Sequence, residues 1–310
     1  MANMQRRYSK NDLANRLGWQ DLDADYLRQL IGLAKIEDLA GAGLAERPQF
    51  LGDVTSMLLP QGGRGRAAVV ARVEGVACGL PMIEMILAAY GEGFSVELAL
   101  ADGDAIVPGK VLATIEGPVV PLLQAERVLL NFLQHLSGVA SETQRYANAL
   151  KGSETLLLDT RKTTPGFRVL EKYAVACGGG FNHRIGLFDR IMLKDNHLHV
   201  AGWVEGAALT EAVRSARSAA ESIPVEVEID TLAQLQPVLD AGADVVLLDN
   251  FSTDELQAAV SQTNGLALLE ASGGITLERL PELALLGLDF ISTGALVHQS
   301  RWCDLGLDWL

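Results

Sequence analysis

The segment at residues 224–250 reads PVEVEIDTLAQLQPVLDAGADVVLLDN and holds an apolar strand pattern, a helical pattern and a second apolar strand pattern in succession. The first strand pattern ends with Glu228 and Asp230, and the second ends with Asp249 and Asn250. A helix between two strands is typical of parallel neighbours, because antiparallel neighbours need only a short turn. The segment therefore predicts a βαβ unit with polar side chains at its strand ends.

The same rhythm extends over the chain beyond residue 150. Four further strand patterns are TLLLDTRK (155–162), RIMLKDN (190–196), LALLEASGG (266–274) and FISTGA (290–295). Helical patterns separate most of the six strands, at 167–176, 203–220, 231–241, 253–262 and 276–286. Such repeats favour a barrel-like parallel α/β unit, and about six strands are too few for the eight of a complete barrel.

The region before residue 118 has a different pattern. Short strands broken by glycines at 67–117, with one helix at 81–90, predict a small β-rich domain. Gly62–Arg66 is expected to be a solvated turn. Helices are expected at 22–46 and 118–150, and on the second of these Arg127, Asn131 and His135 share one face. That polar stripe faces water or a helix end, or it borders a ligand site or a subunit partner.

The domain limits follow from these patterns. Residues 1–137 are expected to form the N-terminal domain and residues 138–295 the barrel domain. The tail at 296–310, which includes RWCDLGLDWL, is apolar and is expected to dock back on the first domain.

The charge distribution points to a small anionic ligand. The chain has 25 Lys and Arg against 39 Asp and Glu, a net charge of −14. Between residues 161 and 194 the balance reverses, with seven basic residues against two acidic ones. A concentrated cationic patch in an acidic protein suits a small, highly charged anion, whereas nucleic acid calls for a broad basic face. We therefore expect no nucleic-acid partner.

The remaining composition indicates a cytoplasmic enzyme. No apolar run approaches the roughly 20 residues of a membrane span, and the N-terminal basic residues precede no apolar stretch of a secretory signal. Cys78, Cys177 and Cys303 are odd in number and lack metal-ligand spacing, which is typical of reduced thiols. The five histidines form no HExxH motif, so a built-in zinc site is not expected.

The strand ends hold the candidate chemistry. Carboxyl ends of parallel strands meet at one edge, and charged residues after apolar strands are costly unless they share a polar pocket. Arg161 and Arg184 have planar forks suited to carboxylates or phosphates, while Lys162 and Lys194 supply point charges. His183 is either a further anion donor or a packed neutral histidine.

Two other kinds of group complete the predicted pocket. Glu228 and Asp249 offer oxygens for ribose hydroxyls or a hydrated Mg²⁺. The turns Ser272-Gly273-Gly274 and Thr293-Gly294-Ala295 can present backbone N–H groups to a phosphate. A structural rim of ion pairs is the alternative explanation of the charged strand ends.

Several motifs occur together in a characteristic order. They are QAERVLLNFLQHLSGVAS (124–141), DTRKTTPGFRVLEKYAV (159–175), CGGGFNHRIGLFDRIMLKDNH (177–197), VEVEID (225–230), LLDNF (247–251), EASGGI (270–275) and STGAL (292–296). In order and spacing the chain closely resembles the quinolinate phosphoribosyltransferases, over nearly its whole length. Ala271 is a departure, because many relatives have serine there.

The resemblance implies a reaction and an architecture. Quinolinate and 5-phosphoribosyl 1-diphosphate would give nicotinate mononucleotide, diphosphate and CO₂, with Mg²⁺, in NAD biosynthesis. This is the reaction of a pentosyltransferase. The implied protomer has an N-terminal α/β sandwich and an incomplete parallel α/β barrel, and it assembles as a homodimer or a higher homo-oligomer.

The resemblance also implies roles for the matching residues. Arg161, His183 and Arg184 would bind the quinolinate carboxylates, with Thr160 beside them. The expected catalytic residues are Lys162, Lys194, Glu228 and Asp249. The lysines would hold both substrates, and the two acids would bind ribose and Mg²⁺, partly through water and substrate. The turns at 272–274 and 293–295 would hold the 5-phosphate, and Arg127 would reach the neighbouring subunit's site.

Three other functions fit parts of the pattern. One is a related phosphoribosyltransferase that acts on nicotinate, and another is the molybdenum-transport-associated homologue. The third is a non-catalytic anion-binding protein with the same fold. The full set of cationic and acidic residues favours the quinolinate enzyme over all three.

Overall fold

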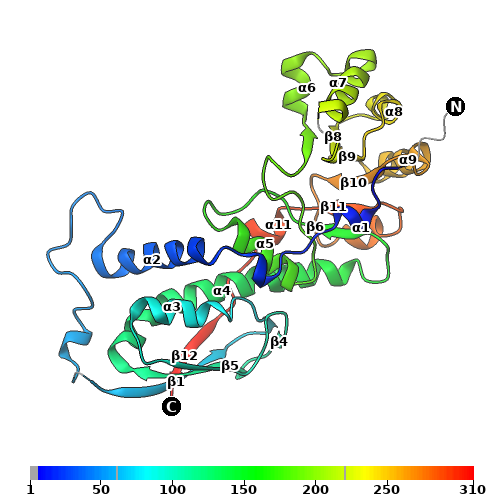
Figure 1. The fold of residues 1–310 in the computed structure, drawn as a ribbon. Coiled ribbons are helices and arrows are strands. Elements are labelled where there is room, and N and C mark those ends of the chain that lie inside the picture. Colours follow the sequence, from blue (N-terminus) through cyan, green and yellow to red (C-terminus); the bar gives the residue numbers. More distant parts are fainter. Residues whose placement is uncertain (1–5, 61, 220) are drawn as a thin grey trace. The chain divides into compact units, whose positions relative to one another are not determined.

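A computed structural model describes residues 6–60, 62–219 and 221–310 of the chain (Figure 1). The chain forms two compact units, each built from three segments. The first, here called the barrel unit, contains Met1–Arg16, Arg145–Thr164 and Gly180–Gln299. The second, the sandwich unit, contains Leu17–Gln144, Pro165–Gly179 and Ser300–Leu310. The boundary expected after residue 137 lies inside one continuous helix, α4 (Val119–Ala149).

The barrel unit is organised around six parallel strands in the order β6-β11-β10-β9-β8-β7. Their bounds are β6 Leu156–Leu158, β7 Ile191–Leu193, β8 Val225–Ile229, β9 Val245–Asp249, β10 Leu268–Ser272 and β11 Phe290–Ser292. From β7 to β11, strands that follow one another in the sequence pair in space, and the first strand, β6, pairs with the last, β11, as in a barrel. In the described part of the chain β6 and β7 do not pair, so the sheet stays open. The predicted incomplete parallel α/β barrel is confirmed.

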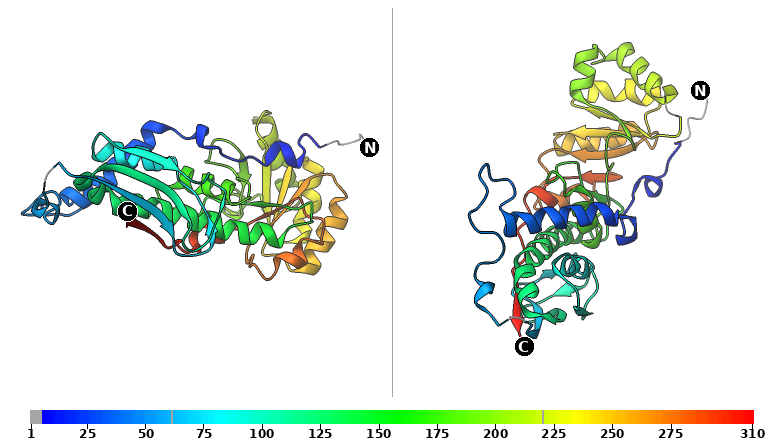
Figure 2. Two further views of the ribbon diagram at one scale, coloured as in Figure 1. Left: turned by 90° about the horizontal axis from the view of Figure 1, so that it is seen from below. Right: turned by 60° about the vertical axis from the view of Figure 1, so that its left-hand side comes forward.

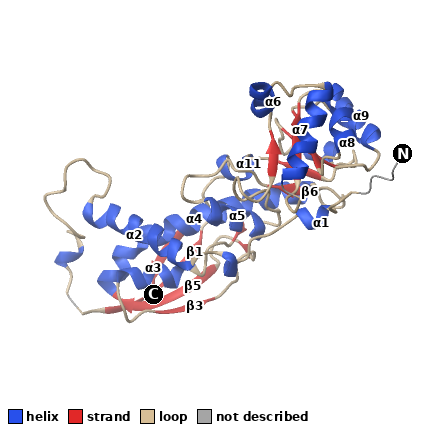
Figure 3. Cartoon of the chain, turned by 45° about the horizontal axis from the view of Figure 1, so that its top comes forward, coloured by secondary structure: helices blue, strands red, loops and turns tan. Residues whose placement is uncertain are grey.

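Helices separate the strands of the barrel unit (Figure 3). They are α6 (Asp195–Ala201), α7 (Gly206–Ala219), α8 (Leu232–Ala241), α9 (Thr253–Thr263), α10 (Leu280–Leu283) and α11 (Ala295–His298). The α7 helix packs beside α8, and α8 beside α9. The sequence patterns missed α6, because its polar first turn directly follows β7 and resembles a strand end.

Local sequence signals set the limits of α8. The Gln234 side-chain oxygen accepts hydrogen bonds from the backbone N–H groups of Asp230 and Thr231, at 2.9 and 3.1 Å. These donors precede the helix and would otherwise lack an intrahelical partner. At the other end Gly242 adopts a left-handed conformation, with φ of 79°, that favours glycine. The helix therefore begins and ends where the sequence pattern predicts.

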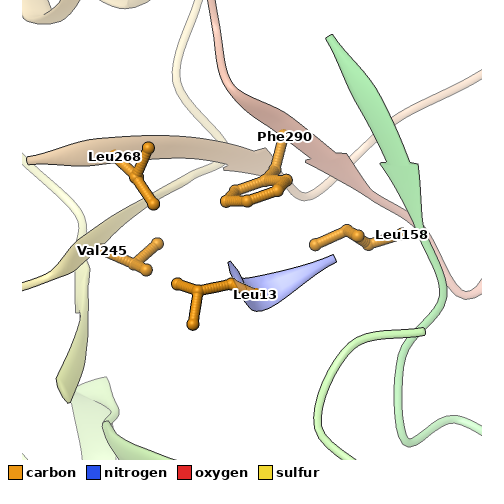
Figure 4. Close-up of a cluster of buried hydrophobic side chains, with 5 residues drawn as sticks. All are labelled: Leu13, Leu158, Val245, Leu268 and Phe290. Atoms are coloured by element: carbon orange, nitrogen blue, oxygen red, sulfur yellow. The ribbon is translucent and has the colours of Figure 1, made fainter. Parts of the chain in front are cut away.

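The Leu13 side chain packs at the amino ends of three strands (Figure 4). Leu13, at the end of α1 (Lys10–Leu13), is buried against Val245, Leu268 and Phe290, the first residues of β9, β10 and β11. Leu158 completes this buried apolar cluster. Leu13 thus covers the amino ends of β9, β10 and β11, on the side opposite the carboxyl ends of those strands.

The sandwich unit contains an antiparallel sheet in the order β12-β1-β5-β3. Figure 1 labels β12, β1 and β5 of this sheet, and Figure 2 shows the chain from two further sides. The strands are β1 (Arg64–Ala71), β3 (Ser95–Leu98), β5 (Val111–Pro118) and β12 (Leu305–Trp309), and β2 (Gly75–Val76) pairs separately with β4 (Ala105–Ile106). The C-terminal tail thus adds β12 to this sheet, in antiparallel register with β1. The remaining elements are α2 (Ala24–Ala40), α3 (Met82–Tyr90), α5 (Arg168–Cys177) and the short 3₁₀ turns η1 (Trp19–Asp21) and η2 (Ser56–Leu58).

One local expectation in this unit was wrong. Residues 62–66 were expected to form a turn, yet β1 already begins at Arg64. Arg64 pairs with Pro118 and Arg66 with Glu116 across the ladder to β5. The alternating arginines and glycine form the exposed start of a strand whose later residues are buried.

No helix among the described residues is both long enough and apolar enough to span a membrane.

Candidate active site

The carboxyl ends of the parallel strands bring the predicted groups to one edge of the barrel unit, here called the strand-end rim. Ser272 at the end of β10 pairs with Asp249 at the end of β9. The backbone N–H of Thr293 donates to the carbonyl of Leu158, the last residue of β6, at 3.1 Å. A Cβ on Gly294 would lie 2.7 Å from the Lys162 side chain, so Lys162 lies against the turn that follows β11.

Two arginines lie near one another at this rim. Arg184 is buried, with 8% of its surface exposed. Burial and the charge of the neighbouring Arg161 lower the pKa of Arg184 below its ordinary value. The Nε atom of Arg161 is buried and donates no hydrogen bond within the described structure. Two cationic groups held together, one with an unsatisfied buried donor, are suited to a bound anion with several oxygens.

Lys194 and Glu228 form an ion pair across two neighbouring strands. Lys194 directly precedes α6, and its Nζ contacts Glu228 Oε2 at the end of β8. The lysine side chain is 39% exposed while that of Glu228 is 9% exposed. The amine therefore reaches both the buried acid and the solvent side of the rim.

Four carboxylates at the rim influence one another. Burial raises the pKa of Glu228, and the nearby Asp249 and Asp195 raise it further against the opposing effect of Lys194. Burial, Asp195 and Asp249 likewise raise the pKa of Asp230. Clustered carboxylate oxygens that repel one another are the donors that hard cations such as Mg²⁺ prefer.

The turn after β10 has a backbone that requires glycine. Gly273 has φ of 82°, and a Cβ there would lie 2.3 Å from Asn250 Oδ1. The preceding Ser272 is partly exposed at the rim. In the turn after β11, Thr293 is buried, and its hydroxyl oxygen accepts a hydrogen bond from the Ala295 N–H at 3.2 Å. Both turns thus keep the backbone close to the strand ends, without bulky side chains.

A second group of charges lies deeper and is here called the interior network, formed by His183, Arg190, Glu226 and Glu270. Arg190 Nη1 donates to Glu226 Oε2 at 2.9 Å. His183 Nε2 lies 3.2 Å from Glu226 Oε2 and 3.5 Å from Glu270 Oε2. All four side chains are buried, so most of their charge is balanced inside the protein.

Two features act on the His183 imidazole in opposite directions. Burial disfavours its charged form, but Glu226 and Glu270 outweigh burial and raise the pKa to about 9. The Nδ1 atom accepts the Arg184 backbone N–H at 2.7 Å, which requires that this nitrogen carry no proton. The two buried carboxylates dominate, because the Arg184 contact is between adjacent residues and a small ring rotation would release it.

The predicted site residues are placed as follows. Thr160, Arg161, Lys162, His183, Arg184, Lys194, Glu228, Asp249, Ser272, Gly273, Gly274, Thr293, Gly294 and Ala295 all belong to the barrel unit. His183 lies within the interior network and not at the outer rim. Arg127 belongs to the sandwich unit, where it is exposed on α4. Its expected role across a subunit interface stays a prediction.

Three members of the interior network, Arg190, Glu226 and Glu270, have no assigned role in the expectations from the sequence. The sequence does contain a signal for Glu226. In VEVEID (225–230), Glu226 and Glu228 alternate with valine and isoleucine. Alternate residues of a strand point to the same side, so two acids at this spacing indicate a polar face inside the barrel.

His135, the last residue of the polar stripe on α4, contacts other residues of the sandwich unit. His135 Nε2 lies 2.8 Å from Oε1 of the fully buried Glu171 of α5. The His135 ring also contacts the rings of Phe167 and Trp302, with centroids 5.9 and 5.5 Å away. His135 therefore holds helices of the sandwich unit together, and Arg127 at the other end of the stripe is the position open to a ligand or partner.

Two family models match the chain. The N-terminal domain model of quinolinate phosphoribosyl transferase matches residues 53–137, and the C-terminal domain model matches residues 139–308.

Curated relatives and solved structures agree with these models. A probable nicotinate-nucleotide pyrophosphorylase [carboxylating] of Bacillus subtilis is 42% identical over 83% of this chain and 88% of its own length. The Mycobacterium leprae nicotinate-nucleotide pyrophosphorylase [carboxylating] is 38% identical over 93% and 99%. The Francisella tularensis nicotinate-nucleotide pyrophosphorylase structure has a TM-score of 0.85 at 35% identity, covering 93% of this chain and 98% of that one. A human nicotinic acid phosphoribosyltransferase shares the fold, at 14% identity and a TM-score of 0.58.

Proposed function

Because this chain belongs to the quinolinate phosphoribosyltransferase family, we propose that it transfers the phosphoribosyl group of 5-phosphoribosyl 1-diphosphate to quinolinate. The products are nicotinate mononucleotide, diphosphate and CO₂, and the reaction serves de novo NAD synthesis. The observation that supports this most is the strand-end rim, which places paired arginines, two lysines and clustered carboxylates on one edge of the barrel unit.

Arg161 and Arg184 bind the two carboxylates of quinolinate in this proposal. Their adjacent guanidinium groups match two neighbouring anionic groups on one ring, and the free Nε of Arg161 gains an acceptor. A substrate with one carboxylate has less use for two arginines. His183 is held in the interior network by Glu226 and Glu270, which fixes the position of the adjacent Arg184 in the chain.

The remaining rim residues bind the sugar donor. Lys162 and Lys194 offset the negative charge that builds on the departing diphosphate, and Glu228 and Asp249 favour the electron-poor ribose as the bond at C1 breaks. The pyridine nitrogen then attacks C1, and the quaternised ring accepts the electrons released by loss of CO₂. The turns 272–274 and 293–295 hold the 5-phosphate.

Mg²⁺ is part of the proposal, because the carboxylates along the rim are hard oxygen donors. Glu228 and Asp249 would hold it together with water and substrate oxygens, since neither acid belongs to a close cluster of three potential ligands among the described residues. When bound, the ion supplies additional stabilisation of the leaving diphosphate.

The assay that tests the reaction measures CO₂ released from carboxyl-labelled quinolinate. We expect release only when the phosphoribosyl donor and Mg²⁺ are both present. Turnover with nicotinate but not with quinolinate would instead identify a nicotinate enzyme. Binding of the labelled substrate without any turnover would identify an anion-binding protein of this fold.

We also propose a homodimer or higher homo-oligomer in which Arg127 acts in the neighbouring subunit's site. The exposed position of Arg127 on α4 is compatible with this. Inactive Arg127→Ala and Lys194→Ala protomers should regain activity when mixed, because one site of each heterodimer then has both wild-type side chains. Absence of rescue in verified heterodimers would argue against a shared site.

A cytoplasmic location completes the proposal. All three cysteines are free thiols, as is usual for proteins of a reducing compartment.

A further inference from the structure

Two cysteines and one aspartate, distant in sequence, come together in the sandwich unit. Cys78 follows β2, Asp102 lies in the turn before β4, and Cys177 is the last residue of α5. One potential ligand atom of each lies within 4.8 Å of the other two. None of the three has a role in the proposed reaction.

The surrounding hydrogen bonds hold these three residues in place. Asp102 accepts hydrogen bonds from the backbone N–H groups of Gly79 and Leu80, both at 2.9 Å, and from the Tyr173 hydroxyl at 2.7 Å. The backbone N–H of Cys78 donates to Ser137 Oγ at 3.1 Å. A carboxylate oriented by several donors is typical of metal sites, in which outer hydrogen bonds fix the ligands.

We propose that Cys78, Asp102 and Cys177 bind one thiophilic divalent cation of the Zn²⁺ class. The two sulfurs and one carboxylate oxygen supply three ligands of a tetrahedral site, and water supplies the fourth. On binding, each thiol passes its proton to solvent, and two metal–sulfur bonds form without any change of oxidation state. Asp102 has an oxygen lone pair to spare, because its three hydrogen bonds leave part of its acceptor capacity unused.

The burial of the three residues is compatible with this proposal. Cys78 is fully buried, whereas Asp102 and Cys177 are partly exposed, so an ion reaches the cluster from the side of the latter two. Thiolate ligands select soft or borderline cations over Mg²⁺, which prefers oxygen ligands. The cluster therefore differs in its metal preference from the rim carboxylates, and a bound ion would fasten the end of α5 to the turn before β4.

Cobalt spectroscopy of the full-length, reduced protein tests the proposal, because Co²⁺ substitutes for Zn²⁺ and reports sulfur ligation directly. In excess Mg²⁺, we expect one Co²⁺ per chain, with a sulfur-to-cobalt charge-transfer band and the visible bands of a tetrahedral ion. Zn²⁺ should displace the cobalt and bleach both bands. The readout does not depend on enzyme activity.

Variants connect the spectrum to the residues. Cys177→Ser replaces a partly exposed thiol, and we expect it to lose about half of the charge-transfer intensity and to weaken Co²⁺ binding at least tenfold. Tyr173→Phe removes the hydroxyl that hydrogen-bonds to Asp102 and to Cys177, and it should weaken binding by about tenfold with the band shape preserved. The control is Cys303→Ser, since Cys303 is also buried but hydrogen-bonds to Ser141 and lies outside the cluster.

Three results would overturn the proposal. The first is the absence of a charge-transfer band at stoichiometric Co²⁺. The second is a Cys177→Ser variant with the wild-type spectrum and affinity. The third is a chain that binds no cation and instead loses two hydrogens in air, as measured by mass spectrometry, which would identify Cys78 and Cys177 as a redox pair.

Discussion

The interior network and the strand-end rim lie in the same unit and both contain charged side chains, but they differ in where those charges find partners. In the interior network, Arg190 donates to Glu226, and the two carboxylates surround His183. At the rim, the buried Nε of Arg161 has no acceptor among the described residues, and Lys194 is partly exposed beside Glu228. The comparison indicates that the interior charges stabilise the fold and hold neighbouring residues in place. The rim charges remain available to substrate.

The largest expected effect is on folding and follows from Glu226→Ala. Removing this acid leaves Arg190 and His183 buried without their main counter-charge, which costs about 3–5 kcal/mol of unfolding free energy. Urea unfolding followed by circular dichroism measures it. Glu205→Ala, at an exposed position of the same unit, is the control and should change the free energy by less than about 0.5 kcal/mol. If Glu226→Ala unfolded at the same urea concentration as the wild type, the interior network would not stabilise the fold.

The second effect is on binding and follows from Arg161→Ala. This substitution should weaken quinolinate binding by about 2–5 kcal/mol, because it removes a charged donor from a desolvated site. Calorimetric titration with quinolinate measures the affinity, and urea unfolding should show little loss of stability. Arg214→Ala, at an exposed position of α7, serves as the control. Equal quinolinate affinity in Arg161→Ala and wild type would remove Arg161 from the site.

The third effect concerns the pH dependence of stability. The folded-state pKa of His183, about 9, is higher than the ordinary value of 6.5, so the folded protein binds this proton more tightly than the unfolded chain. The resulting stabilisation is fully present below pH 6.5 and is lost as the pH rises through 9, by up to about 3 kcal/mol. Unfolding free energies of wild type and His183→Gln, measured from pH 6 to 9.5 in urea, should converge at high pH.

A constant difference between the two proteins across that range would contradict this expectation. It would mean that His183 stays neutral in the fold, with Nδ1 accepting the Arg184 N–H.

The smallest effect compares two neighbouring glycines of the rim. Gly273→Ala forces a side chain into a left-handed backbone and to within 2.3 Å of Asn250 Oδ1, whereas a Cβ on Gly274 meets nothing closer than Arg279 Nη1 at 3.7 Å. Both positions have positive φ, so both variants have about 1–2 kcal/mol of backbone strain, and only Gly273→Ala adds a clash. The KM for the phosphoribosyl donor should therefore rise more in Gly273→Ala. An equal rise would indicate that the turn after β10 adjusts freely.

Much of the barrel unit was predictable because its strands and helices have local signals. The alternating run at 225–229 and the mostly apolar run at 245–249, with a capped helix between them, specify a βαβ unit, and the observed β8, α8 and β9 follow those runs closely. The helix α6 and the start of β1 were not predicted, because polar residues directly after a strand and glycines between arginines resemble loops.

The candidate site was predictable only in part. Residues directly after apolar strands were correctly expected to share an edge, since the carboxyl ends of parallel strands coincide. The interior partners of His183 come from β8 and β10, and no spacing in the sequence indicates which acids of different strands meet one imidazole. The thiol cluster was missed for the same reason, since Cys78, Asp102 and Cys177 have no ligand spacing along the chain.

The sequence by itself determined the order of strands and helices, the positions of polar residues at strand ends and the local excess of positive charge, because periodicity, capping and composition are properties of short segments. Only the tertiary structure decided that His183 lies between two buried acids, while Arg161 Nε finds no acceptor within the part of the chain that the structure describes. Burial and the distance between charges depend on how strands far apart in the sequence pair, and those two quantities determine whether a charged side chain serves the fold or the substrate.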